Sequence, residues 1–316
     1  MRYKRIHKIL LLIITLIVFL LLFSQVNFIE IQQTLRRTNY YYLALAGLLS
    51  FLFPLLNAIR WHLIVCELGV NLGLWESFKI IMAAWPLGTI TPAKSGDLVK
   101  LFFLRNVLPY SHTSGVILAE RLLDVLVLCL YAFLFGILVK LWVAVWISLA
   151  MFSGVVILFL VVESRWMVYL PEKILLLTQN IFLASKKIYS SLSVFLLLLL
   201  VTLLNWFLSL LQTWVCYQAF DAQVPFVYLA AALPLAIFIG LIPVTISGMG
   251  TRDTAMIVLF EKYAAYETNL AAGILYSIFG YWLLTLLGLP FMKAAFDGAI
   301  EGVEGQKLRK KALAEE

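Results

Sequence analysis

Long apolar runs separated by short polar segments dominate this chain. Six of the runs reach about the 20 residues that an α-helix needs to cross the hydrocarbon core of a bilayer. The first run is too long for a signal-peptide core, and no small-residue cleavage site follows it, so we interpret it as an uncleaved span. The pattern therefore predicts an all-α, polytopic membrane protein. The expected spans are about Ile9–Phe28, Tyr40–Val65, Ser114–Val139, Leu141–Val162, Leu192–Tyr217 and Leu270–Phe291.

Two further apolar stretches, 74–108 and 226–263, are interrupted by proline, glycine and hydroxyl-bearing residues. The interruptions lie at 85–97 in the first stretch and at 242–253 in the second. Unpaired backbone groups are so unfavourable in hydrocarbon that a broken helix is tolerated only inside protein or beside a water-filled cavity. The apolar arms on either side of each break are also short for a full crossing. We therefore expect two re-entrant helical hairpins, which give about eight spans if each hairpin is counted.

The two hairpins divide the chain into corresponding halves. When the spans cross in alternation, the hairpins enter from opposite faces, as in the inverted repeats of transporters, whose substrates bind at such broken helices. We expect a single transmembrane domain over residues 1–292 and a basic cytoplasmic tail over 293–316. The expected halves are about 1–140, with the hairpin at 74–108, and about 141–292, with the hairpin at 226–263.

Basic residues gather before Ile9, in 163–190 and in the tail, and the net charge is +7. Because Lys and Arg near spans favour the cytoplasmic side, we predict that both termini are cytoplasmic in a multi-pass protein of the cell (inner or plasma) membrane. Arg36 and Arg37, in a short loop predicted outside, oppose this topology. The charge accounts for topology and gives no reason to expect a nucleic-acid partner.

Composition excludes several classes of protein. With 63% hydrophobic and 13% charged residues, the chain does not match a soluble globular domain. Cys66, Cys129 and Cys216 lack the spacing of a zinc site or a disulfide framework. Neither a phosphate-binding loop motif nor the sequence motifs of serine hydrolases and zinc peptidases occur. We therefore expect no catalytic residues, no metal and no cofactor.

Charged residues in the two broken stretches are the candidate binding residues, because a charge inside the membrane is costly, at about 2.5–3.5 kcal/mol on insertion scales. Lys94 and Arg252 can bind a phosphate together with exposed backbone amides. In the alternative, Asp97 and Asp253 cap helices and the two cations are their counter-ions. The predicted substrate-binding set is Lys94, Asp97, Arg252, Asp253, Thr91, Ser247, Gly96, Gly248, Gly250 and Arg60.

A second set of charges, Glu120, Arg121 and Asp124, falls inside a predicted span. Glu120 and Asp124 share a helix face, and Arg121 can pair with Asp124 at i, i+3 or with a neighbouring helix. Two interpretations stay open, proton or ion coupling and a structural ion pair. Arg60 is interpreted as extending to the cytoplasmic interface, with an inward orientation as the alternative.

The order and spacing of these residues resemble the lysylphosphatidylglycerol synthase transmembrane (flippase-like) family over about residues 9–291. The motifs are Arg60-Trp61, Pro92-x-x-x-Gly96-Asp97, Glu120-Arg121-x-x-Asp124, and Pro243 through Gly248-x-Gly250-x-Arg252-Asp253. Asp97 stands where the family often has Glu, which keeps the charge and shortens its reach. The resemblance implies a counterpart of the lipid-translocating membrane region of the multiple peptide resistance factor, without its soluble aminoacyl-transferase domain.

Two classes of function follow. The first is a flippase that moves a phosphate-bearing lipid, such as an aminoacylated phospholipid or a polyprenyl-phosphate-linked sugar, through a polar cavity at the broken helices. The alternative is a membrane-embedded transferase, or the membrane subunit of a glycosyl or aminoacyl transferase. We expect a transporter rather than an enzyme, with a membrane lipid as substrate. A partner synthase or glycosyltransferase and a homo-oligomer are further expectations.

Overall fold

The computed structural model describes residues 38–89, 91, 97, 100, 110–163, 175, 179, 182–183, 185–242 and 244–292. The predicted first span and the basic tail lie outside the described residues, as does the second arm of the first hairpin except for Lys100. Most of the segment 163–190 lies outside them as well. Within the described part the regular structure is helical throughout, which confirms the predicted all-α class.

Four helical stretches in the described part are long and apolar enough to cross a membrane, namely Tyr40–Glu67, Gly115–Leu138, Leu192–Ala219 and Tyr266–Met292. Their positions agree with four of the predicted spans. The last stretch changes to a π-helix partway along, and such bulges are frequent at functional sites. The helices concerned are α3 (Tyr40–Ser50), α4 (Leu52–Glu67), α7 (Tyr110–Leu138), α10 (Leu192–Ala219), α13 (Tyr266–Ser277) and the π-helix η4 (Ile278–Trp282).

A fifth apolar helix, α8 (Trp142–Glu163), corresponds to the predicted span at Leu141–Val162. Three shorter helices flank the predicted breaks: α5 (Leu74–Thr89) before the first, and α11 (Phe226–Leu241) and α12 (Thr251–Phe260) around the second. With 16, 16 and 10 residues, they rise about 24, 24 and 15 Å, which is less than a hydrocarbon core of about 30 Å.

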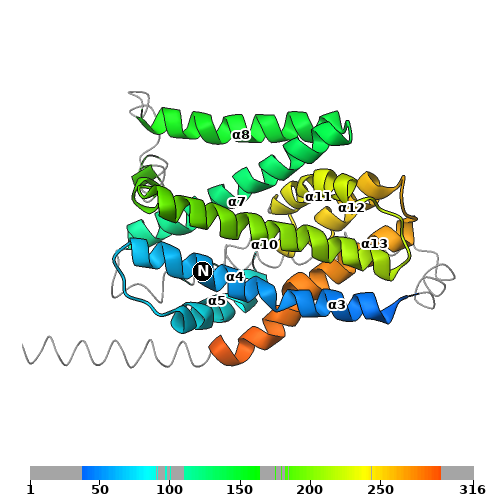
Figure 1. Ribbon diagram of the computed structural model, residues 1–316, viewed down its shortest axis with the longest axis horizontal. Coiled ribbons are helices and arrows are strands. Elements are labelled where there is room, and N and C mark those ends of the chain that lie inside the picture. The colour runs from blue at the N-terminus through cyan, green and yellow to red at the C-terminus, as the bar shows by residue number, and fades with distance from the viewer. Residues whose placement is uncertain are drawn as a thin grey trace, which may run out of the picture.

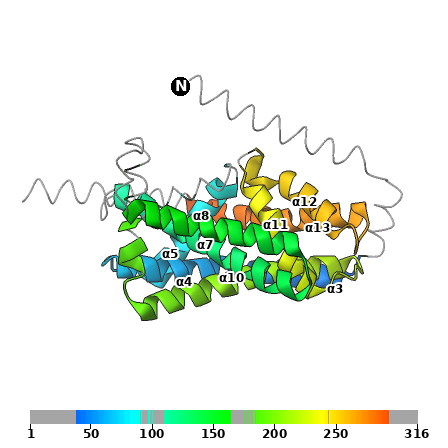
Figure 2. The same ribbon diagram turned by 90° about the horizontal axis from the view of Figure 1, so that it is seen from above.

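The helices pack side by side around a shared centre. Helices α3 and α4 lie end to end along α10, and α5 packs against α4 (Figure 1). Helix α7 contacts α8, α10 and α11, and α10 contacts α3, α4, α7, α11 and α13. Seen from above, α11 lies between α10 and α12 (Figure 2). This arrangement brings the middle of α7 close to both broken segments.

Large apolar side chains cover the outside of the bundle. Trp146 and Leu160 of α8 are 68% and 61% exposed, and Leu192 of α10 is 70% exposed. Such a surface is unfavourable in water and is well solvated by lipid chains. Several charged side chains, among them Arg60, Glu120 and Arg252, are buried inside the bundle, whereas others, such as Asp221 and Lys262, are exposed at turns between helices.

The second broken segment packs against the end of α11 through a contact between two glycines, Gly248 and Gly240. Gly248 has a φ of 72°, a left-handed conformation that glycine adopts without steric cost. A Cβ atom at Gly248 would lie 2.5 Å from the carbonyl oxygen of Gly240. The chain can therefore approach α11 closely enough to place Ser247 and Arg252 toward the centre of the bundle.

Candidate functional site

Arg60 of α4 lies inside the bundle, with a side chain only 2% exposed. Its Nη1 donates to Asp124 Oδ1 at 2.6 Å, and its Nη2 lies 2.7 Å from Glu120 Oε1. Nη2 also donates to Asn57 Oδ1 at 3.0 Å. The expected extension of Arg60 to the interface is therefore wrong. Two carboxylates of α7 hold it inward, because a guanidinium deep in the bundle needs paired charges.

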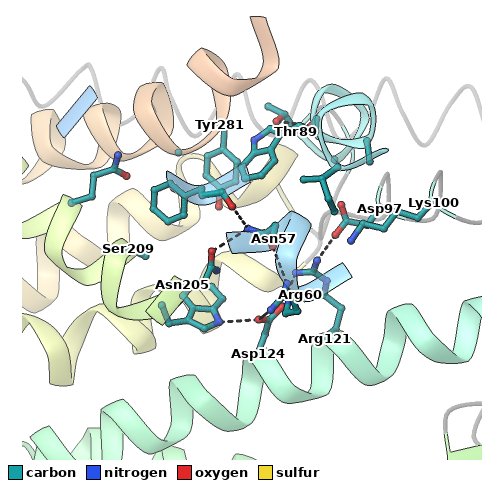
Figure 3. Close-up of a pocket in the computed structure, with 18 of the residues that line it drawn as sticks. Asn57, Arg60, Thr89, Asp97, Lys100, Arg121, Asp124, Asn205, Ser209 and Tyr281 are labelled. Carbon is teal, nitrogen blue, oxygen red and sulfur yellow. Dashed lines mark hydrogen bonds and ion pairs between the residues drawn. The ribbon is translucent and has the colours of Figure 1, made fainter. Parts of the chain in front are cut away.

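Asp124 of α7 joins three elements in the centre of the site (Figure 3). Besides Arg60, its Oδ1 accepts a hydrogen bond from Trp206 Nε1 of α10 at 3.0 Å. Its Oδ2 accepts one from Arg121 Nη1 at 2.9 Å, which is the predicted i, i+3 pair. One carboxylate thus receives three donors and fixes α4, α7 and α10 relative to one another.

Arg121 also pairs outside its own helix. Its Nη2 donates to Asp97 Oδ2 at 2.5 Å, so the cation connects α7 to the first broken segment (Figure 3). The expected i, i+3 pair with Asp124 therefore occurs together with a pair outside α7, whose partner lies in the first broken segment rather than on a neighbouring helix. The Arg121 and Asp97 side chains are 32% and 16% exposed, so this ion pair is more accessible than the others.

Lys100 completes the cluster. Its Nζ donates to Glu120 Oε2 at 3.2 Å and lies 4.8 Å from the centre of the Trp61 ring. Three cations and three carboxylates of the described residues thus form a connected set, which offsets the cost of placing each charge inside the membrane. Whether the carboxylates also couple a proton or an ion stays a prediction.

The second broken segment carries its own buried ion pair. Arg252 Nε and Nη2 donate to Asp253 Oδ1 at 3.1 and 2.7 Å, and Nη2 donates to Ser277 Oγ at 2.5 Å. The guanidinium carbon lies 4.2 Å from the centre of the Tyr276 ring, within the range of a cation–π contact. The backbone N–H of Gly250 donates to Asp253 Oδ2 at 2.9 Å, an N-terminal cap of α12. This is the arrangement expected as the alternative to direct binding.

The tips of the two broken segments touch. Ser247 Oγ donates to the carbonyl oxygen of Thr89 at 2.5 Å and lies 3.3 Å from that of Gly88. These carbonyl groups lie in the last turn of α5, where helix carbonyls need partners from outside the helix. Thr285 Oγ1 donates to Thr89 Oγ1 at 2.8 Å, and Thr91 Oγ1 donates to the carbonyl of Leu87 at 2.7 Å. The polar tips are therefore joined to each other and to the last span.

Two adjoining cavities lie within this polar region. The first, of about 90 Å³, lies between α4, α5, α7, α10 and the last helix, and the second, of about 190 Å³, lies between α7, α10, α11 and the second broken segment. They share a wall made of Arg121, Asp124, Trp206 and Tyr281. Two charged residues of α7, Arg121 and Asp124, therefore face both cavities.

The predicted binding residues divide between these cavities. Arg60 and Asp97 line the first, and Ser247 and Arg252 line the second. Lys94 and Gly96 lie outside the described residues. Thr91, Asp253, Gly248 and Gly250 are not among the lining residues and shape the broken segments instead.

Sequence reasoning missed several residues that line the cavities, among them Lys100, Trp206, Tyr281 and Ser209. Lys100 had a usable signal, because it is a cation three residues after Asp97 in an apolar run. Trp206, Tyr281 and Ser209 had none, because nothing in the order of residues selects one aromatic or hydroxyl group among many. Within the described ranges no group of three or more His, Cys, Asp or Glu residues is arranged to hold a metal ion.

The fold and this site define a polytopic α-helical membrane protein with charged internal cavities. The sequence profile described as "Lysylphosphatidylglycerol synthase TM region" matches residues 8–288, and the chain belongs to this family. The chain is also similar to two archaeal proteins, each described as a UPF0104 membrane protein. That of Methanothermobacter thermautotrophicus is 23% identical over 300 residues, covering 82% of this chain and 87% of the relative. That of Methanocaldococcus jannaschii is 22% identical over 319 residues, covering 91% and 95%.

Proposed function

We propose that this protein moves a lipid with a phosphate-bearing polar headgroup between the two leaflets of the cell membrane. Aminoacylated phospholipids and polyprenyl-phosphate-linked sugars are the two substrate classes considered. The headgroup passes the two adjoining cavities while the acyl or prenyl chains stay in the surrounding hydrocarbon. The observation that carries the proposal is the pair of charged cavities, which meet at a shared wall inside an otherwise apolar bundle.

Three further features support transport. Charged side chains that face a cavity inside a membrane bundle mark substrate and ion pathways. Helices α11 and α12 are too short to cross alone, which fits a re-entrant hairpin at a substrate site. The chain also belongs to a family named for the membrane region of a lipid-modifying synthase.

The proposal is tested by leaflet-resolved lipid movement in proteoliposomes. The purified chain meets aminoacylated phosphatidylglycerol, a polyprenyl-phosphate sugar and unmodified phosphatidylethanolamine, each with and without a proton gradient. We expect faster movement of one phosphate-bearing class than in protein-free vesicles. Stimulation by the gradient identifies coupled transport, and equal rates identify downhill movement.

The matched variants are Arg252→Gln and Lys262→Gln. Arg252 lines the second cavity, whereas Lys262 lies on the exposed turn after α12. Both variants lose one positive charge and keep a polar side chain. We expect Arg252→Gln to lower transport by at least about tenfold, because it removes the cation that lines the second cavity and pairs with Asp253, and Lys262→Gln to behave as wild type. No lipid movement by correctly folded wild-type protein overturns the transporter and favours the transferase.

A further inference from the structure

We infer that Arg121 is the residue that receives the phosphate group of the ligand, and that Asp97 occupies this position until the ligand arrives. The inference rests on the proposed function, because it names the contact that the headgroup makes. It follows from the position of Arg121, from its exposure, and from which nitrogen atoms of its guanidinium are already in use.

Arg121 is the one cation of the described residues that lines both cavities. Arg60 and Lys100 line only the first, and Arg252 lines only the second. The Arg121 side chain is 32% exposed, whereas those of Arg60 and Arg252 are each 2% exposed. An anion that passes from one cavity to the other can therefore reach Arg121 from both sides.

One nitrogen of the Arg121 guanidinium has a fixed partner, and another has a partner that a ligand can replace. Nη1 donates to Asp124 Oδ2, and Nη2 donates to Asp97 Oδ2. Among the described residues, Nε has no hydrogen-bond partner. Because Nε and Nη2 point along the same edge of a guanidinium, the departure of Asp97 opens a two-donor edge that matches two phosphate oxygens. Asp124 keeps the group in place during this exchange.

The other cations are less suited to an exchange. Arg252 already gives both Nε and Nη2 to Asp253, whose side chain is fully buried. Lys100 is held by Glu120, which is also fully buried. Displacing either carboxylate leaves an unpaired charge in the interior, which is strongly unfavourable. Asp97 is partly exposed, so its release is less costly.

The ligand group is a phosphate that carries one or two negative charges. Replacing the Asp97 carboxylate by a phosphate keeps an anion beside Arg121, so the guanidinium still has two anionic partners, Asp124 and the phosphate. A phosphodiester of a lipid headgroup and free inorganic phosphate share this chemistry. The experiment therefore includes both.

The test measures equilibrium binding to the full-length chain in nanodiscs by calorimetry. The probes are dihexanoyl-phosphatidylglycerol, inorganic phosphate and dihexanoyl-glycerol, which has no phosphate. We expect the phosphodiester to bind and the neutral lipid not to bind. Asp97→Asn removes the competing charge and should tighten phosphodiester binding by about three- to tenfold, whereas Arg121→Gln should weaken it by at least about tenfold. Arg121→Lys keeps the charge without the two-donor edge and should fall between wild type and Arg121→Gln.

The controls are Asp221→Asn and Lys262→Gln, which make the same kinds of change at exposed turns. Asp221 has a φ of 56°, which Asn also adopts readily, so this control causes no new backbone strain. Both controls should bind as wild type.

Unchanged binding by Arg121→Gln, or no tightening by Asp97→Asn, overturns the assignment. If Arg121→Gln does not fold, the Arg121→Lys and Asp97→Asn results decide. Binding of inorganic phosphate alone supports the Arg121 site and rejects a lipid headgroup as its ligand. Phosphate-dependent binding without lipid movement supports Arg121 and overturns the proposed transport, whereas movement that does not depend on Arg121 does the reverse.

Discussion

At the residue scale, the backbone contact between Gly240 of α11 and Gly248 of η3 (Ile246–Gly248) sets the position of the second broken segment. Gly248 is left-handed, and the carbonyl of Gly240 occupies the space that a side chain would need. The position of the tip therefore requires that residue 248 has no Cβ atom. Ser247 and Arg252, which line the second cavity, lie on either side of this contact along the chain.

We predict that Gly248→Ala destabilises the protein by about 1–3 kcal/mol, because the added Cβ meets Gly240 and strains the backbone. The measurement is the midpoint of unfolding of the purified protein in detergent. The control is Gly154→Ala in α8, where a Cβ meets nothing within 4 Å. In a helix interior this control should be neutral or stabilising by up to about 1 kcal/mol. Equal stability of Gly248→Ala and wild type contradicts the close contact.

The sequence predicts most of the charged residues that belong to the site, but it predicts their ion-pair partners only where the two residues are close in sequence. Spacing is enough for Arg121 and Asp124, since i, i+3 neighbours on one helix must lie close. It is not enough for Arg60, because its carboxylate partners lie about 60 residues away on α7. A position near the end of an apolar run looks the same in sequence whether the side chain points outward or inward.

At the element scale, a side-chain hydrogen bond joins α4 and α10. Asn57 Nδ2 donates to Asn205 Oδ1 at 3.0 Å, a hydrogen bond of the kind that asparagine forms between membrane helices. Asn57 Oδ1 also accepts a hydrogen bond from Arg60, so Asn57 links Asn205 to the buried charges of the site. Both asparagines line the first cavity.

We predict a coupling energy of about 0.6–1.7 kcal/mol between Asn57 and Asn205, the range for polar contacts between membrane helices. It is measured by a double-mutant cycle with Asn57→Leu, Asn205→Leu and the double variant, from the midpoints of unfolding. Asn57→Leu should cost more than Asn205→Leu, because it also removes the acceptor for Arg60. Strict additivity of the two single changes argues against the contact.

The sequence predicts the helices better than it predicts how they pack. Helix α11 covers the predicted arm before the break, from residue 226 to residue 241. Its first residue follows a proline, Pro225, and its last residue lies near the end of the apolar run. Helix α12 begins at Thr251 rather than three residues later, since Asp253 caps it from within its first turn. The packing of one helix against another depends on side-chain shape across the whole bundle. The spacing of apolar residues along the sequence does not determine which helices become neighbours.

At the scale of the whole molecule, the alternation of spans places the end of α4 on the cytoplasmic side if the N-terminus is cytoplasmic. Cys66 lies in the last turn of α4 and is exposed, whereas Cys129 and Cys216 are buried. The natural cysteines therefore report on topology without new substitutions.

We predict that a membrane-impermeant maleimide labels Cys66 from the cytoplasmic side only, in inverted vesicles and not in intact cells. Cys129 and Cys216 should react only after denaturation, because both are enclosed by neighbouring helices. Peptide mapping by mass spectrometry identifies the labelled residue. Labelling of Cys66 in intact cells reverses the predicted topology of the termini.

The hydrogen bond from Ser247 joins the second broken segment to the end of α5. Ser247 has a φ of 51°, which costs a residue with a side chain about 1–2 kcal/mol. A hydrogen bond typically returns about 0.5–1.5 kcal/mol, so the joint is nearly balanced in free energy. Loss of this hydrogen bond alone leaves the end of α5 joined to the last span through Thr89 and Thr285. Under the proposed transport, alternating access, with one face open at a time, requires a contact between the two tips that breaks at little cost in free energy.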